Sequence, residues 1–440
     1  MGTHFDPDKI TRAFSTLDVH DYGDVLQCMR CGLCLPTCPT YRTDGVETQS
    51  PRGRVALIKA VIDGKMKASE EFVEHIYHCL DCRNCQTVCP AGVKPGELVL
   101  EARYRIEENR HQPLIKKFLL NYAILDHKRL AKLLAPLKIY QISGLQALVR
   151  KYDILKLISE DLEFMEALPP KLPSRPLSED LSEEIPAVGR ERGRVGFFLG
   201  CAMNLIFADT SRATIDNLTR SGFRVIVPKE VQCCGTPNIA EGERKIYREM
   251  AENTIRIFED RRVDCVVTDC AACGSELKTY RNMFHKNLKL AAKAAEFSNK
   301  VRDISEFLDS AWTPDIKLGP VPEIACFHDP CHLRHGQKLT SPQRNLLKRI
   351  PQLDYHELSD EGQCCGSAGI YNITHRDRSM KLLKSKIEAI EKTHAQTVIS
   401  SNPGCLMQLA YGSRHWNKCW NVIHISEILN RSLRSGEKIG

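Results

Sequence analysis

The stretch Val231-Gln-Cys-Cys-Gly235 recurs as Gly362-Gln-Cys-Cys-Gly366, and it is the clearest of several signals that repeat along the chain. Met250 is followed by Met380 at an offset of 130, and four cysteines recur at offsets of 130 to 132. Constant offsets over independent signals indicate a duplicated structural unit. The paired cysteines are Cys201 with Cys331, Cys233 with Cys364, Cys234 with Cys365, and Cys273 with Cys405.

Short apolar runs alternate with amphipathic stretches in each copy, which predicts strands alternating with helices in a parallel sheet. In the first copy we expect strands at 195–199, 224–227 and 263–268. The cysteines follow these strands, so they should gather at the carboxyl edge of the sheet, where α/β folds bind ligands. We predict two α/β modules, the first module over residues 191–315 and the second module over residues 316–440.

A different cysteine pattern occupies the start of the chain. The run Cys28-x2-Cys31-x2-Cys34-x3-Cys38-Pro39 recurs as Cys79-x2-Cys82-x2-Cys85-x3-Cys89-Pro90. This spacing is typical of [4Fe–4S] binding, and in two-cluster ferredoxins the fourth cysteine of each run ligates the other cluster. The predicted ligand sets are Cys28, Cys31, Cys34 and Cys89 for one cluster, and Cys79, Cys82, Cys85 and Cys38 for the other.

Two zinc sites are the less favoured interpretation of these runs, because zinc prefers paired cysteines at longer separations. The residues between the runs predict helices over 51–63 and 69–78. We therefore expect residues 1–110 to form a helical ferredoxin domain whose two clusters carry electrons.

Adjacent side chains in extended backbone diverge and fit one tetrahedral ion poorly, so the Cys-Cys-Gly pairs suit a larger inorganic cluster or a turn at a sheet edge. Soft thiolates in this number select an iron–sulfur cluster or zinc in these modules. The second module has no counterpart of Cys270, the fourth of the five cysteines in the first module. Pro403 stands near the equivalent place. Its four cysteines can hold a cubane cluster or a zinc ion. The predicted cofactor-binding residues are Cys201, Cys233, Cys234, Cys270 and Cys273 in the first module, and Cys331, Cys364, Cys365 and Cys405 in the second.

The remaining cysteines and the nearby histidines have less distinctive settings. Cys265, Cys326 and Cys419 are expected to be buried structural cysteines. His328, His332 and His335 flank Cys331, where one could hydrogen-bond a cluster sulfur. An ordinary loop or outer-layer position for all three histidines is an equally good interpretation.

Composition narrows the function classes. The chain has 440 residues, 20 cysteines and a formal net charge of +7. This charge is modest for the length and does not favour a nucleic-acid partner. No stretch of about 18 apolar residues occurs, and the first residues lack an apolar signal core. We therefore expect a cytoplasmic protein in a reducing compartment, where many cysteines indicate metal or redox chemistry.

Residues 111–190 separate the two cysteine-rich parts and are predicted to form a basic helical connector followed by a Pro/Ser-rich linker. Residues 112–158 hold nine basic and two acidic residues, with apolar residues at helical spacing. The favoured interpretation is a connector whose apolar face packs on the other domains. The alternative is a basic amphipathic surface peripheral on the inner face of a membrane.

The twin modules resemble the cysteine-rich domains of heterodisulfide reductase and of several respiratory flavoprotein partners. The whole layout also resembles the iron–sulfur subunits of anaerobic glycerol-3-phosphate dehydrogenase and of glycolate oxidase. The glycolate oxidase family is favoured by His328-Asp-Pro-Cys-His-Leu-Arg-His-Gly-Gln337, by Gln363-Cys-Cys-Gly-Ser-Ala-Gly-Ile-Tyr-Asn372, and by Ser50-Pro-Arg-Gly-Arg54.

This resemblance implies an electron-transfer subunit of an oxidoreductase. A separate FAD-binding subunit would oxidise glycolate or D-lactate, and the clusters would pass the electrons to a quinone or another acceptor. The chain shows no nucleotide-binding motif, so we expect no flavin, no nucleotide and no catalytic residue on it. The rival interpretations are a heterodisulfide-reductase-type or glycerol-3-phosphate-type subunit, and a zinc-loaded scaffold that anchors a flavoprotein.

Overall fold

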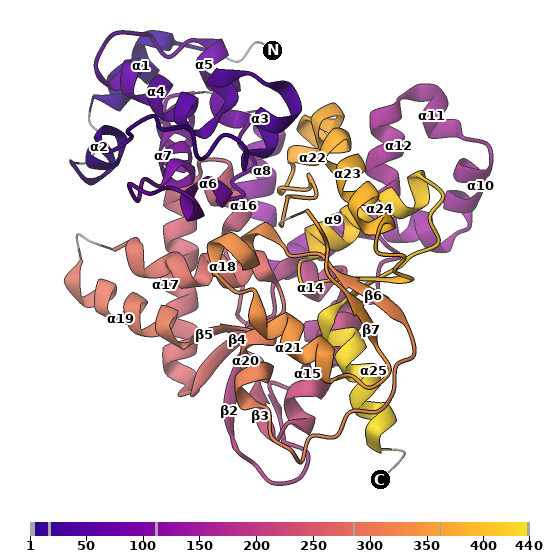
Figure 1. Cartoon of the computed structure of the whole chain (residues 1–440). Coiled ribbons are helices and arrows are strands. Elements are labelled where there is room, and N and C mark those ends of the chain that lie inside the picture. The colour runs from indigo at the N-terminus through magenta and orange to yellow at the C-terminus, as the bar shows by residue number, and fades with distance from the viewer. Residues whose placement is uncertain (1–4, 16–18, 111–112, 285–286, 361, 438–440) are drawn as a thin grey trace. The chain divides into compact units, whose positions relative to one another are not determined.

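The computed structural model describes residues 5–15, 19–110, 113–284, 287–360 and 362–437 (Figure 1). Contacts divide the chain into two compact units. Unit 1 comprises Met1–Tyr122, Gly235–Arg248 and Gly366–Leu382, and unit 2 comprises Ala123–Cys234, Glu249–Cys365 and Leu383–Gly440. The sequence predicts four domains with boundaries after residues 110, 190 and 315. That division rests on motifs and composition and not on contacts, and it stays a prediction.

Unit 1 is helical, as predicted for the ferredoxin domain. Its described residues contain no strand. The expected helices between the cysteine runs are present, and serine caps begin both: Ser50 accepts the Gly53 N–H, and Ser69 accepts the Phe72 N–H. The helices are α1 (Pro7–Phe14), α2 (Val19–Leu26), α3 (Pro39–Asp44), α4 (Pro51–Ile62), α5 (Glu70–Tyr77), α6 (Asn84–Thr87), α7 (Pro95–Glu108), α8 (Leu114–Phe118), α16 (Thr236–Ala240) and α22 (Tyr371–Thr374), with the turn η1 (Glu47–Gln49).

A single apolar core joins the main helices of unit 1. It is built from α1, α4, α5 and α7, and Phe14 meets Phe72 edge-on with ring centroids 5.6 Å apart. Cys28, Cys79 and Cys89 are packed against this core. The core residues include Ile10, Phe14, Val55, Ile58, Phe72, Val73, Ile76, Leu98, Val99 and Ile106.

Two segments distant in sequence complete unit 1. In one, the Arg103 guanidinium donates to the Ala240 carbonyl at 2.8 Å, and the Asn238 amide donates to the Leu120 carbonyl at 2.8 Å. In the other, Arg378 forms an ion pair with Asp44 at 2.9 Å. Each of these segments directly follows a Cys-Cys pair in the sequence.

Unit 2 contains two parallel sheets that confirm the predicted duplication. The first has the order β3 (Phe223–Ile226), β2 (Gly193–Phe197), β4 (Cys265–Thr268), β5 (Val301–Asp303), with β1 (Glu184–Ile185) antiparallel beside β3. The second has the order β7 (Asp354–His356), β6 (Ile324–Phe327), β8 (Thr397–Ser400), β9 (Asn421–His424). The parallel strands run in the same order in both sheets, so the modules share one topology.

Helices connect the strands of each sheet, as parallel pairing requires. The last helix of each module starts directly after its edge strand. The first module has α14 (Cys201–Leu205), α15 (Ala208–Arg220), α17 (Arg244–Arg261), α18 (Ala271–Thr279), α19 (Leu288–Lys300) and α20 (Ile304–Ala311). The second module has η4 (His332–Gly336), α21 (Ser341–Arg349), α23 (Arg376–Glu391), α24 (Pro403–His415) and α25 (Ile425–Glu437).

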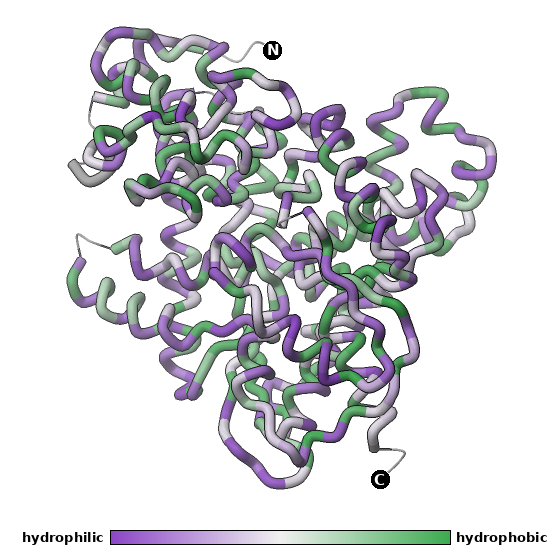
Figure 2. Tube along the Cα trace, in the orientation of Figure 1, coloured by the Kyte–Doolittle hydropathy of each residue, from purple (hydrophilic) through white to green (hydrophobic). Residues whose placement is uncertain are grey.

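The connector is helical as predicted, and its central helices are packed only in part. It contains η2 (Leu119–Ala123), α9 (His127–Ile142), α10 (Leu145–Lys151), α11 (Ile154–Ile158) and α12 (Glu160–Ala167). No residue of α9, α10 or α11 is buried, and Leu157 is 84% exposed. Figure 2 shows hydrophobic residues along these helices. The expected packing of an apolar face is therefore found only in part: Leu134 and Leu137 of α9 are half-buried and His127 meets Asn204 of α14 at 2.9 Å, whereas Ile139, Leu148 and Leu157 are exposed.

Among the described residues, no helix combines the length and the apolar character needed to cross a bilayer.

Candidate metal centres

The two cysteine runs of unit 1 adopt the same unusual backbone. Arg30 and Gly32 have positive φ angles of 56° and 89°, and their counterparts Asp81 and Arg83 have 48° and 61°. Non-glycine residues rarely adopt this region, so its repetition at equivalent places in both runs indicates a shared local fold. Each run thus turns tightly between its first and third cysteines, and the Asp81 N–H lies 3.4 Å from the Cys79 Sγ.

One pocket of unit 1 is lined by the first run. This pocket of about 420 Å³ has Cys28, Cys31 and Cys34 on its wall, together with Cys89 from the end of the second run. These are the four cysteines that the spacing assigns to one cluster. Cys85 and apolar residues such as Leu33, Val55 and Val93 complete the lining.

A second pocket is lined by the other predicted set. Its volume is about 390 Å³, and Cys79, Cys82 and Cys85 line it with Cys38 from the first run. Cys85 lines both pockets, so the two thiol groups are neighbours within unit 1. Burial raises the pKa of Cys85 well above its usual range. Such a thiol stays protonated unless a cation replaces the proton, which is the exchange that cluster binding requires.

The Ser50–Arg54 stretch places one arginine at each pocket. Arg52 lines the first pocket, donates to the Arg30 carbonyl at 2.9 Å and pairs with Glu47 at 2.7 Å. Arg54 lines the second pocket and is 1% exposed. It donates to the His75 carbonyl at 2.8 Å and to Thr40 Oγ1 at 3.1 Å.

Arg54 has no carboxylate partner among the described residues. A buried guanidinium without a counter-charge is costly, because burial removes its hydration. Four thiolates around a [4Fe–4S] core would supply that negative charge. The residues around the second pocket therefore fit an anionic cluster in donor type, number and electrostatics.

The first module brings its five predicted cysteines together at the carboxyl edge of its sheet. Cys201 begins α14 after β2, Cys233 and Cys234 follow β3, and Cys270 and Cys273 follow β4. The Cys201 thiol lies 3.6 Å from the Cys233 Sγ. Hydrogen bonds to the thiols of Cys201 and Cys234, together with burial, raise the pKa of Cys233 well above its usual range.

The other end of this thiol group is equally close. The Cys273 N–H donates to the Cys270 Sγ at 3.4 Å. Hydrogen bonds to Cys234 and Cys270, with burial, raise the pKa of the Cys273 thiol. The neighbouring Cys233 and Cys234 therefore face different partners, Cys201 on one side and Cys273 on the other. Five soft donors in one buried group fit a multinuclear iron–sulfur cluster better than one tetrahedral ion.

The second module gathers its four predicted cysteines in the same way. A hydrogen bond to Cys364 and burial raise the pKa of Cys331, and the sulfur atoms of Cys365 and Cys405 lie within 4.8 Å of each other. A ring nitrogen of His328 lies within the same 4.8 Å of both sulfurs. Of the three histidines that flank Cys331 in the sequence, the structure thus puts buried His328 beside two of the thiols.

Asn402 occupies the place of the missing cysteine. It is the N-cap of α24, two residues after β8, just as Cys270 is the N-cap of α18 two residues after β4. The sequence comparison put Pro403 near this place; the structure corrects the position by one residue. The Asn402 amide donates to the Cys405 Sγ at 3.5 Å, and its oxygen accepts from the Cys270 thiol at 3.7 Å. One amide therefore links the thiol groups of the two modules.

The three other cysteines differ in environment. Cys326 is buried in β6 and Cys265 is half-buried in β4, and burial raises their thiol pKa values to about 11 and about 12. Cys419 is exposed. The expectation of a buried structural cysteine is therefore wrong for Cys419, which lies in the loop before β9.

Comparisons with known proteins agree with this arrangement. Residues 195–278 and 325–410 match the family model of the cysteine-rich (CCG) domain, and residues 24–93 match that of a 4Fe–4S dicluster domain. Residues 111–168 match the linker region of the glycolate oxidase iron–sulfur subunit. A probable glycolate oxidase iron–sulfur subunit of Bacillus subtilis is 37% identical over 420 residues, which cover 93% of this chain and 94% of the relative.

The chain belongs to the glycolate oxidase iron–sulfur subunit family. A second relative, the glycolate oxidase iron–sulfur subunit of Escherichia coli, is 28% identical and covers 88% of this chain and 91% of its own length. A fumarate reductase (CoM/CoB) subunit from Methanothermobacter marburgensis is 29% identical over 90% of this chain and 71% of its own length. Members of this family are iron–sulfur electron-transfer subunits, and this chain has that oxidoreductase role.

The sequence did not show how close three side chains, those of Arg52, Arg54 and His328, lie to the thiols. Arg52 and Arg54 were noted only as part of a resemblance, since nothing in a sequence says which arginine will be buried beside a cysteine. His328 was visible only as one of three loop histidines. Alignment of the two copies at the repeat offset of 130 places His328 opposite Phe198. The change from an apolar to a metal-binding residue type at this position is the sequence signal that could have identified it.

Proposed function

We propose that this chain carries electrons from an FAD-binding partner subunit, which oxidises glycolate or D-lactate, to a quinone or another acceptor. The observation that carries the proposal is the pair of neighbouring thiol-lined pockets in unit 1. Cys85 lines both, so two clusters held there would be close enough for rapid electron exchange. The family relationship supports the 2-hydroxy-acid partner.

Within this proposal, each pocket binds one [4Fe–4S] cluster. Cys28, Cys31, Cys34 and Cys89 hold the first, and Cys79, Cys82, Cys85 and Cys38 hold the second. The five cysteines of the first module hold a further iron–sulfur cluster. When bound, these groups accept and release single electrons; the surrounding side chains exclude water and set the local charge.

The deciding experiment is anaerobic affinity purification of the tagged chain from its native cell. The partners are identified, and dye reduction is measured with glycolate, D-lactate and glycerol 3-phosphate. We expect a flavoprotein partner and dye reduction by a 2-hydroxy acid. Dye reduction with glycerol 3-phosphate alone would contradict the proposed 2-hydroxy-acid substrate. Disulfide reduction by the isolated chain would favour a subunit of the heterodisulfide-reductase type. A colourless, iron-free protein would instead support the zinc scaffold.

The cluster assignment has its own test. In Cys31→Ser we expect one cubane signal to be lost from the reduced electron paramagnetic resonance spectrum, while the signals of the other clusters remain. Cys419→Ser is the matched control, because Cys419 is exposed and lies outside every thiol group described above. An unchanged spectrum in Cys31→Ser would refute the ligand set.

We also propose that α9 to α11 rest on the anionic inner surface of a membrane, near a quinone acceptor. Ile158 and Tyr152 are 67% and 60% exposed, and the exposed Lys151 and Lys156 flank them. Apolar side chains can enter the lipid interface, and each basic residue near it adds about 1 kcal/mol.

Sedimentation with phosphatidylserine vesicles at low and high salt tests this surface. We expect binding at low salt that Leu157→Glu/Ile158→Glu abolishes without changing iron content. No sedimentation at low salt would end the membrane proposal, and would leave electron transfer from the flavoprotein untouched.

A further inference from the structure

His328 is a fully buried histidine beside the thiols of the second module. Its exposed fraction is 0%, and a ring nitrogen lies within 4.8 Å of both Cys365 Sγ and Cys405 Sγ. It directly follows β6, so the backbone that ends the strand aims the side chain into the same sheet edge that carries the cysteines.

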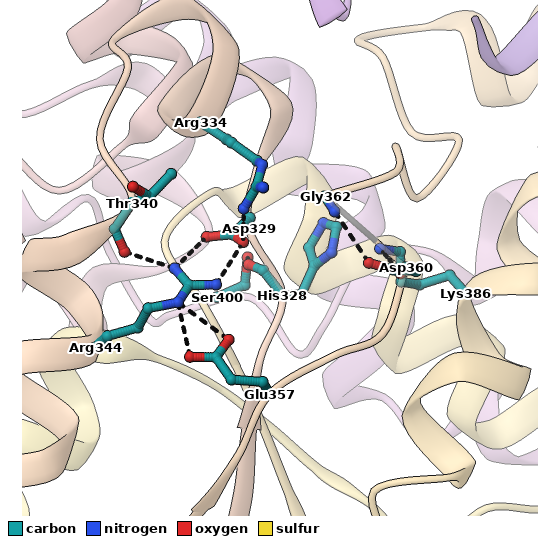
Figure 3. Close-up of polar contacts among 10 residues, drawn as sticks. All are labelled: His328, Asp329, Arg334, Thr340, Arg344, Glu357, Asp360, Gly362, Lys386 and Ser400. Carbon is teal, nitrogen blue, oxygen red and sulfur yellow. Dashed lines mark hydrogen bonds and ion pairs between the residues drawn. The ribbon is translucent and has the colours of Figure 1, made fainter. Parts of the chain in front are cut away.

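The imidazole of His328 has no hydrogen-bond partner among the described residues, although the backbone of the same residue is satisfied. The His328 N–H donates to the Ile399 carbonyl at 2.8 Å, and its carbonyl accepts from Ser400 Oγ at 3.2 Å. Neither ring nitrogen is paired. Figure 3 shows the bare ring among neighbours that are themselves engaged, with Arg344 bound to Asp329 and Lys386 to Asp360.

Such a ring is unusual, because buried polar groups are nearly always satisfied and an unpaired one costs about 1–3 kcal/mol. Ion pairs hold the polar side chains around it in place, so they are not free to turn towards the imidazole. The thiols of Cys365 and Cys405 are also neighbours, and a thiol is a weak hydrogen-bond partner. Imidazole nitrogen and thiolate sulfur are, however, the usual ligand pair for zinc and can share an iron centre.

The duplicated fold supplies an internal comparison. In the first module the residue after β2 is Phe198, which is also 0% exposed and whose N–H donates to Val267 at 2.8 Å. His328 makes the equivalent bond to Ile399 at the same distance. Phe198 and His328 therefore occupy equivalent positions in the two modules. The side chain there is a phenyl ring in the first module and an imidazole, which can bind a metal, in the second.

A second position changes in the opposite sense. Cys270 of the first module corresponds to Asn402 of the second, where the side chain is a poor ligand for a soft metal. The second module has thus lost one thiol after its third strand and gained one imidazole after its first. Both positions border the same group of donors, so the number of strong ligands remains five.

We propose that His328 is a nitrogen ligand of the metal centre in the second module, where it takes over the role of the missing thiolate. The site is then a mixed imidazole–thiolate centre formed with Cys365 and Cys405, and completed by Cys331 and Cys364. A zinc ion would take four of these donors, with His328, Cys365 and Cys405 among them, whereas an iron–sulfur cluster could use all five. The inference rests on the cubane cluster or zinc ion that the sequence predicts for this module, but it does not depend on the partner subunit or the substrate.

The duplication also provides matched substitutions for the test. His328→Phe installs the residue that the first module tolerates at this position. Asn402→Cys restores the fifth thiol, and the double variant recreates the first module's donor set. His335→Phe is the control, because His335 is another buried histidine of the same loop that lies outside the donor group.

Iron and zinc are measured in all four variants after anaerobic purification of the full chain. We expect His328→Phe to lose one zinc, or the iron of one cluster, while the signals of unit 1 remain. The double variant should regain the metal, and His335→Phe should keep it. Wild-type metal content in His328→Phe would overturn the proposal, and so would loss without recovery in the double variant.

A spectroscopic measurement on the wild-type chain is independent of any folding defect. For zinc, X-ray absorption should show an imidazole nitrogen at about 2.0 Å beside sulfur at about 2.3 Å. For iron, the reduced cluster should show a nitrogen coupling that changes with ¹⁵N-histidine labelling and is absent in His328→Phe. A sulfur-only centre, or a second module without metal, would overturn the assignment. Both the metal content of the variants and the spectra of the metal centre can be measured even if no flavoprotein co-purifies, so failure of the proposed function would be distinguishable from failure of this inference.

Discussion

Arg54 and Arg52 show how two residues of one short motif can have different electrostatic effects. Arg54 is buried beside the second pocket without a carboxylate partner among the described residues, whereas Arg52 is paired with Glu47 at 2.7 Å. A fixed positive charge near a cluster favours the reduced, more negative form. The uncompensated arginine should therefore raise the reduction potential more than the paired one.

This difference predicts the outcome of matched substitutions. A full charge several ångströms away at an effective dielectric constant of about 20 contributes about 2 kcal/mol, on the order of 100 mV for one electron. Arg54→Met should shift the potential of one cluster negative by about that amount, as measured by redox titration. Arg52→Met should shift its cluster by much less. Equal shifts in the two variants would contradict the argument.

His424 predicts a pH dependence of stability. It is fully buried, donates to the Asp269 carbonyl at 2.8 Å and accepts from the Ser426 N–H at 3.0 Å, and burial lowers its pKa to about 4. The unfolded chain binds a proton below a pH of about 6.5, but the folded chain does not until about 4. The stabilising contribution is therefore complete above pH 6.5 and is lost as the pH falls towards 4.

The loss should be on the order of 3 kcal/mol over this range. His424→Gln keeps a donor for the Asp269 carbonyl but cannot titrate, so its thermal midpoint should fall less steeply between pH 7 and pH 5. The exposed His394→Gln should keep the wild-type slope. Identical slopes in all three proteins would show that His424 is not the titrating group.

At the scale of elements, α4 depends on one glycine. A Cβ at Gly53 would lie 1.9 Å from the Glu47 carbonyl oxygen, and that atom is backbone and cannot move aside easily. The close approach joins η1 to α4 and so fixes both pocket-lining arginines. Gly53 does not have a positive φ, so its backbone conformation would allow other residues. Glycine is required here because a side chain would have no space.

Gly53→Ala should therefore weaken both cubane sites together. We expect a loss of more than half of the unit 1 iron and a lower thermal midpoint, with the first module's cluster retained. Gly45→Ala is a useful comparison. Its Cβ would meet nothing within 4 Å, so only its positive φ of 69° is strained. Full iron in Gly53→Ala would show that η1 can move aside.

The elements were the most predictable part of the molecule. The strands at β2, β3 and β4, the helices α4 and α5, and the gathering of the cysteines all follow from local patterns and from strand order. The exposure of α9 to α11 could not be foreseen, because a helical pattern does not reveal whether a packing partner exists. Ligand replacement at His328 and Asn402 is similarly hidden, since it depends on two residues about 70 positions apart in sequence that meet at one sheet edge.

On the scale of the whole chain, unit 1 is discontinuous. It needs Gly235–Arg248 and Gly366–Leu382 in addition to its first 122 residues. Arg103 bonds Ala240, and a Cβ at Gly242 would come within 2.7 Å of the Arg103 carbonyl oxygen, so this packing is close. His375 likewise meets His78 edge-on with centroids 4.8 Å apart.

An isolated fragment of residues 1–122 should therefore be less stable than the same residues in the full chain. We expect it to bind iron on anaerobic reconstitution but to lose it faster in air, as followed by the bleaching of its visible absorption. Adding residues 235–248 through a flexible linker should slow that loss in part. Equal bleaching rates for fragment and full chain would show that the later segments are dispensable.

The interrupted path of unit 1 also imposes an order on biosynthesis. The eight cysteines of the two runs leave the ribosome first, but the last residues of their folding unit lie at 366–382. Nearly 300 residues must be translated after Cys89 before that unit can close, as the gap between 89 and 382 requires. During this interval the early cysteines stand in an incomplete unit, so a cluster inserted before residue 382 is made should be more exposed to oxidation than one inserted afterwards.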